Sequence, residues 1–140
     1  MRRLGPLLAA AAGIVLAVLR PFRVEVAGRS MEPTLRAGDW LVATRRGRRA
    51  RGAVVVLADP RTGRALVKRI EAVPGDVTPE GELGPDRYLV VGDNPSESTD
   101  GREFGPVRGG AIEGVVRFRY APRIGAIPRA QAGRGSWRQG

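Results

Sequence analysis

The feature that most constrains this chain is an uncharged apolar run, Leu4–Leu19, that directly follows a short basic start. As a helix, this run would be about 24 Å long, slightly less than the ~30 Å hydrocarbon core of a bilayer. Arg3 and Arg20 flank the run and can extend their charged ends toward the headgroups. We therefore predict a membrane anchor over residues 1–21, a single pass through the cell membrane with the rest of the chain on the extracytoplasmic face.

Two alternatives to a retained anchor are a cleaved signal peptide and a buried helix of a soluble domain. A basic start followed by an apolar run of this length also fits a signal peptide. However, Arg20 and Pro21 follow the run directly, and no clear small-x-small site ends it. These features favour an anchor that stays on the protein.

The chain after the anchor has the pattern of a β domain. Apolar and polar residues alternate with period two in short segments separated by Gly- and Pro-rich turns, and no amphipathic helical stretch of useful length appears. This pattern predicts a mainly β fold, a small barrel or sandwich over residues 22–122, followed by a disordered basic tail over 123–140. The predicted strands are 22–26, Trp40–Thr44, Ala53–Ala58, Arg64–Val73, Arg87–Val91 and Ala111–Tyr120.

Composition restricts the chemistry further, because the chain contains neither histidine nor cysteine. A Ser-His-Asp triad, a thiolate nucleophile and the usual zinc and haem ligand sets are therefore excluded. If the protein is an enzyme, its proton-transfer group must be a carboxylate, a lysine, a tyrosine or the N-terminal amine.

Lysine occurs once, at Lys68, although Lys and Arg together number 24. Arginine stays protonated in proteins, whereas a lysine amine can lose its proton where its surroundings disfavour charge. Strand alternation places Lys68 on one face with Leu66 and Ile70. We expect these apolar neighbours to lower the pKa of Lys68 and make it a general base. The alternative is an ordinary strand lysine that reaches solvent.

Two other segments carry candidate chemistry. Ser30 follows a predicted strand and precedes a turn fixed by Pro33, so its hydroxyl and its own N–H are displayed for attack and oxyanion binding. Its alternative role is to cap that turn. Residues 92–107 are too rich in hydroxyl, carboxylate and glycine for a core strand. We expect them to return to the site with an orienting hydroxyl and a bracing Asp100–Arg102 pair.

In this order, the three segments resemble the type I signal peptidase family, membrane-bound serine proteases with a Ser/Lys dyad. The resemblance covers roughly residues 24–120. The motifs that carry it are Ser-Met-x-Pro-Thr-Leu at Ser30–Leu35, Val67-Lys68-Arg69 with Pro74-Gly75-Asp76, and Gly92-Asp93-Asn94 through Ser98-x-Asp100-x-Arg102 and Gly105.

The resemblance implies an endopeptidase that removes signal or leader peptides from precursor proteins with small-x-small cleavage segments. It needs neither a metal nor an organic cofactor. Ser30 would be the nucleophile and Lys68 the general base. Ser98 would orient the lysine amine with its hydroxyl. Asp93, Asp100 and Arg102 would hold the site together, and Met31 and Pro33 would contact the substrate.

Two positions depart from the family pattern. Gly28 stands where some members carry a second hydroxyl for the oxyanion, and Gly101 stands where a serine is common. The short stretch between Lys68 and Gly92 also leaves little room for the second β domain of larger members.

Other functions stay open. The compact chain also resembles the small maturation protease of nickel superoxide dismutase, which serves one substrate. From another class, it could be a non-catalytic, basic, membrane-tethered binding module. A loop rich in arginine, Arg45–Arg51, and the basic tail could bind lipid headgroups or nucleic acid. Because aromatic residues are 5% of the chain and do not interleave with these arginines, we expect membrane lipid rather than nucleic acid as the partner.

Overall fold

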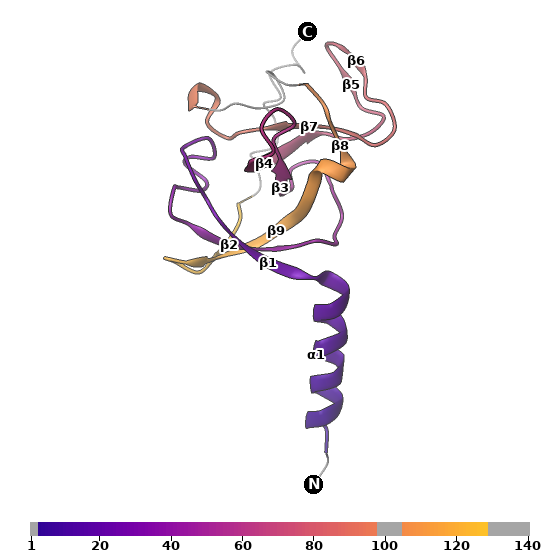
Figure 1. Cartoon of the computed structure of the whole chain (residues 1–140), viewed down its shortest axis with the longest axis vertical. Helices are drawn as coiled ribbons and strands as arrows, with labels where there is room; N and C mark the ends of the chain where they lie inside the picture. The colour runs from indigo at the N-terminus through magenta and orange to yellow at the C-terminus, as the bar shows by residue number, and fades with distance from the viewer. Residues whose placement is uncertain (1–2, 98–104, 129–140) are drawn as a thin grey trace.

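The computed structural model describes residues 3–97 and 105–128. Within them, one α-helix, α1 (Gly5–Leu19), projects away from a β domain (Figure 1). Pro6 lies in its first turn, where the missing N–H costs nothing. It ends at Arg20, whose left-handed backbone lets its N–H donate to the Leu16 carbonyl. No residue of α1 is buried. In the described part of the chain, no helix combines the length and the hydropathy that a membrane span needs.

The β domain is built on one eight-stranded sheet in which neighbouring strands pair antiparallel. Its order is β1-β2-β9-β3-β4-β7-β8, with β10 paired to β9, and β5 and β6 form a separate small hairpin. The strands are β1 (Pro21–Glu25), β2 (Trp40–Thr44), β3 (Val54–Ala58), β4 (Ala65–Ala72), β5 (Val77–Thr78), β6 (Gly81–Glu82), β7 (Arg87–Val91), β8 (Val107–Arg108), β9 (Ile112–Ala121) and β10 (Gly125–Ala126).

Two clusters of buried apolar residues form the core, and β3 contributes to both because its side chains alternate. Val54 and Val56 belong to the first cluster, with Met31 and Leu35 from the segment after β1. Val55 belongs to the second cluster, which also contains residues of β4, β7 and β9. A strand that is buried on both faces reads as a continuous apolar run, as residues 54–57 do.

The prediction of a mainly β fold is confirmed, and all six predicted strands occur with ends shifted by at most a residue or two. A closed barrel is not seen in the described residues, since β1 and β8 each pair on one side only. The range expected to be a disordered tail also contributes structure. β10 pairs with β9, and Ile127 packs against the first cluster.

Candidate active site

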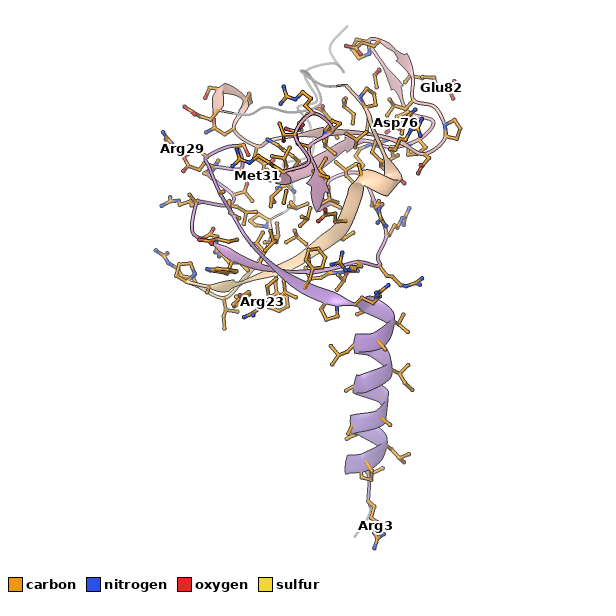
Figure 2. The ribbon with its side chains drawn as sticks, viewed as in Figure 1. Arg3, Arg23, Arg29, Met31, Asp76 and Glu82 are labelled. Atoms are coloured by element: carbon orange, nitrogen blue, oxygen red, sulfur yellow. The ribbon has the colours of Figure 1, made fainter. Side chains whose placement is uncertain are left out.

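Ser30 lies in a tight turn after β1 that is fastened to the core. Met31 and Leu35 are 1% and 0% exposed in the first cluster, and the Leu35 N–H donates to the Met31 carbonyl at 2.9 Å. Figure 2 shows Arg29 at the outer edge of the domain and Met31 directed inward. Ser30 itself is partly exposed. The turn therefore displays Ser30 while its neighbour anchors the backbone.

Gly28, two residues earlier, has a φ of 79°. This left-handed conformation is strained for residues with a Cβ. The backbone conformation at this position therefore suits glycine.

Lys68 lies in the middle of β4 and is 2% exposed. It stands opposite Val55 of β3 in the strand register. On β4, Leu66 and Ile70 pack with the second cluster while Val67 packs against the first, so the expected alternation along this strand is confirmed. A lysine buried to this degree is uncommon, because water no longer solvates its ammonium form.

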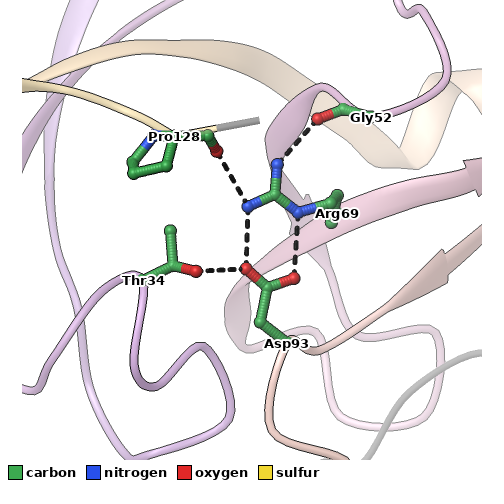
Figure 3. A network of polar contacts seen from close by, with 5 residues as sticks. All are labelled: Thr34, Gly52, Arg69, Asp93 and Pro128. Carbon is green, nitrogen blue, oxygen red and sulfur yellow. Dashed lines mark hydrogen bonds and ion pairs between the residues drawn. The ribbon is translucent and has the colours of Figure 1, made fainter. Parts of the chain in front are cut away.

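Arg69, the next residue, forms a buried ion pair with Asp93 (Figure 3). Arg69 Nε and Nη2 donate to the two carboxylate oxygens at 2.9 and 2.7 Å, a bidentate geometry. Arg69 Nη1 and Nη2 also donate to the carbonyls of Gly52 and Pro128, at 2.8 and 3.1 Å. Thr34 Oγ1 donates to Asp93 Oδ2 at 2.6 Å. One carboxylate therefore joins the Ser30 turn to the strand that carries Lys68.

Asp93 is held ionised in this network. Burial raises the pKa of its carboxyl, but the hydrogen bonds from Arg69 and Thr34 and the positive charge of Arg69 outweigh it, so the pKa lies below the ordinary value for aspartate.

Asn94 adds a second connection between the same segments. Its backbone N–H donates to the Ser30 carbonyl at 2.8 Å, and its side-chain Nδ2 donates to the Arg29 carbonyl at 3.0 Å. Ser96 Oγ donates to the Asn94 side chain at 3.0 Å, which fixes the orientation of the amide. These bonds hold the backbone of the residue that displays the candidate nucleophile.

The predicted site residues are thus placed unevenly. Ser30, Lys68 and Asp93 lie on segments that the network joins, and Pro33 is exposed three residues after Ser30. Met31, predicted as a substrate contact, is almost completely buried and packs in the first cluster. Three other predicted residues lie outside the described part of the chain: Ser98, Asp100 and Arg102.

Sequence reasoning assigned no role to Thr34, Arg69 or Asn94, although each stands inside a motif beside a residue that it did single out. The position of Arg69 in the alternation of its strand could have pointed to its role. A charged residue that alternates out of phase with Lys68, yet lies within an apolar strand, needs a carboxylate partner on its own face.

Comparison with known proteins agrees with this geometry. The family model described as signal peptidase, peptidase S26, matches residues 1–79 and 77–121. The chain belongs to this family of peptidases.

Three relatives illustrate the range of the family. Mitochondrial ATP-independent inner membrane protease subunit 1b of Arabidopsis thaliana is 34% identical over 118 residues, covering 68% of this chain and 67% of the relative. Mitochondrial inner membrane protease subunit 1 of Schizosaccharomyces pombe is 35% identical over 117 residues, covering 72% and 74%. Probable signal peptidase I-2 of Synechocystis is 31% identical over 157 residues, covering 81% and 72%.

Proposed function

We propose that this peptidase is a serine endopeptidase in which Ser30 is the nucleophile and Lys68 the general base. The observation that carries the proposal is the network that joins their segments. Asn94 holds the Ser30 carbonyl, and Asp93 links Thr34 of the same turn to Arg69, the neighbour of Lys68. Lys68 is the only lysine of the chain and is nearly fully buried. Burial disfavours the ammonium form, and a neutral amine is what a general base requires.

The reaction follows from these two groups. Neutral Lys68 Nζ removes the Ser30 Oγ proton as Oγ bonds to the carbonyl carbon of the scissile peptide, and the Ser30 N–H stabilises the oxyanion. The resulting ammonium protonates the leaving amine, and the C–N bond breaks to leave an acyl-enzyme. Water then attacks with Lys68 again as base, which releases the acid product and restores Ser30. In this scheme Ser98 orients the lysine amine, and Asp100 and Arg102 hold the loop.

We propose precursor proteins with small-x-small cleavage segments as the substrates. The mitochondrial and cyanobacterial relatives are named as inner membrane protease subunits or as a probable signal peptidase, which supports a role in removing leader or signal peptides. Pro33, exposed three residues after Ser30, is the proposed substrate contact.

We also propose that α1 holds the peptidase at the cell membrane, with the β domain on the extracytoplasmic face. Its apolar side chains are open to their surroundings, with Leu7 and Leu8 each 68% exposed. A helix with exposed apolar side chains lowers its free energy when it leaves water. Intact-mass measurement of the protein in the membrane fraction tests retention of the segment, since a cleaved signal peptide would remove its mass.

The catalytic proposal is tested with the purified full chain in detergent and a precursor that contains a small-x-small segment. Ser30→Ala should abolish cleavage, and Ser136→Ala, a serine near the C-terminus, should not. Lys68→Arg should be as inactive as Lys68→Ala, because a guanidinium cannot serve as the base. Undiminished cleavage by Ser30→Ala or Lys68→Arg would contradict the dyad.

A further inference from the structure

Four arginines gather where α1 meets the β domain: Arg20, Arg45, Arg46 and Arg48, the junction arginines. The loop after β2 reaches the end of the helix through two backbone bonds. The Arg45 N–H donates to the Arg20 carbonyl at 3.2 Å, and the Arg46 N–H donates to the Leu19 carbonyl at 3.3 Å. All four arginines are exposed. The fold therefore concentrates positive charge at the C-terminal end of the apolar helix.

Within residues 3–97 and 105–128, none of the junction arginines forms an ion pair with a carboxylate. Neighbours in the same loop differ. Arg51 pairs with Asp76 at 2.6 Å, and Arg49 donates to the carbonyls of Gly47 and Ile112. Some arginines of the loop thus have partners within the domain, whereas in the described residues no carboxylate neutralises the junction arginines.

The backbone of the loop and the Arg45 side chain are also braced. The Arg45 guanidinium lies 4.6 Å from the centre of the Phe22 ring, a cation–π contact. Arg117 Nε donates to Thr44 Oγ1 at 2.8 Å, and its Nη2 donates to the Arg46 carbonyl at 3.2 Å. A preorganised cluster loses less conformational entropy when an anion binds.

We propose that the junction arginines bind the phosphate-bearing headgroups of anionic phospholipids. This inference rests on the proposed membrane association of α1. A helix with apolar side chains beside a cluster of arginines that have no carboxylate partner in the described residues matches a lipid molecule, which presents acyl chains next to a phosphate. Single-stranded nucleic acid fits less well, because it needs exposed aromatic faces for stacking, and Arg45 covers the ring of Phe22. The contact would seat the β domain at the membrane surface.

The test uses the full chain and vesicles of phosphatidylcholine, alone or mixed with phosphatidylglycerol, at low salt. Each basic residue near an anionic surface contributes about 1 kcal/mol, which is roughly a fivefold change in binding. Replacing Arg45, Arg46 and Arg48 together by alanine should therefore lower binding to the anionic vesicles roughly 100-fold and leave binding to phosphatidylcholine unchanged. Lysine at the same three positions should restore most of the loss.

The matched control removes the same charge elsewhere, from Arg61 and Arg64 in the β3–β4 turn and Arg108 of β8. Equal losses in the control and junction variants would overturn the inference, because net charge alone would then explain binding. Equal binding of the unmodified chain to both vesicle types would also overturn it but would leave the anchor standing. If the unmodified chain bound neither type of vesicle, the result would contradict both the lipid inference and the proposed membrane association of α1. If the junction variant lost affinity for an RNA oligonucleotide and not for anionic vesicles, nucleic acid would replace lipid as the partner.

Discussion

The network around Asp93 and the cluster of junction arginines both contain arginine. The first buries and pairs its guanidinium group, whereas the second leaves its guanidinium groups exposed. Arg69 is 4% exposed and donates to one carboxylate and two carbonyls. Arg46 and Arg48 are exposed and have no carboxylate partner in the described part of the chain. The two regions lie at different parts of one small domain: one between β4 and the Ser30 turn, the other at the base of α1.

The comparison shows that partners, rather than residue type, decide what each arginine contributes. A buried guanidinium without its carboxylate would be costly, so Arg69 makes the fold dependent on Asp93. An exposed arginine is solvated in any case, and its charge is free to attract an external anion. We therefore expect substitutions in the first region to affect activity and stability, and those in the second to affect association.

The largest expected effect comes from Lys68→Arg. Arginine is also basic, but its guanidinium cannot give up its proton, so kcat/KM should fall on the order of 10⁴-fold, as for loss of a catalytic group. Cleavage of a precursor peptide measures the fall, and circular dichroism checks that the variant is folded. A folded Lys68→Arg enzyme with near-normal turnover would contradict the role of Lys68 as the general base.

Arg69→Ala should come next, with a loss of about 3–5 kcal/mol in the free energy of unfolding, because it leaves Asp93 partly buried without its cation. Arg51→Ala is the matched control. The Arg51–Asp76 pair is as short, at 2.6 Å against 2.7 Å, but the Arg51 side chain is 47% exposed. Its loss should cost only about 0–1 kcal/mol. Similar losses in denaturant unfolding of the two variants would contradict the role given to burial.

Acid should weaken the first region through Asp93. The pKa of its carboxyl is lowered in the folded chain, so its stabilising effect is complete above the unfolded value of about 3.9 and is lost as pH falls through the folded value. Asp93→Asn imitates the protonated state. The difference in Tm between the unmodified protein and this variant should therefore shrink as pH falls below about 4. A constant difference for Asp93→Asn would contradict the ionised pair.

The smallest effects should follow from Arg46→Ala and Arg48→Ala in detergent. Each should change the free energy of unfolding by no more than about 0.5 kcal/mol, as surface substitutions usually do, and peptide cleavage should be unchanged. Thermal unfolding and initial rates measure both quantities. A loss of several kcal/mol in the free energy of unfolding would show that these arginines stabilise the fold, and it would contradict the contrast with Arg69.

Much of the fold follows from local pattern. Residue patterns over five to ten positions, alternating in most strands and continuously apolar in β3, identified β1, β2, β3, β4, β7 and β9. β5, β6, β8 and β10 have two residues each, too few for alternation to appear. Their places depend on turns and on pairing with longer strands, which only the assembled sheet provides.

The candidate site was less predictable, because its contacts join distant segments. Asp93 stands 24 residues from Arg69 and 59 from Thr34 along the chain. Sequence reasoning singled out Asp93 as a supporting group, and it identified the strand phase of Lys68. It could not show that the partner of Asp93 is the residue beside Lys68, since that depends on how β4 and β7 pair.

The protonation state of Lys68 tests the central claim most directly. Because the chain has a single lysine, selective isotope labelling of lysine gives one side-chain signal without assignment, in the full-length protein in detergent. An ordinary lysine titrates near pH 10.4. The account predicts that the Lys68 amine loses its proton at a lower pH than an ordinary lysine, in step with the rise of kcat/KM for precursor cleavage. An amine that stays protonated in the pH range where the enzyme is active would contradict it.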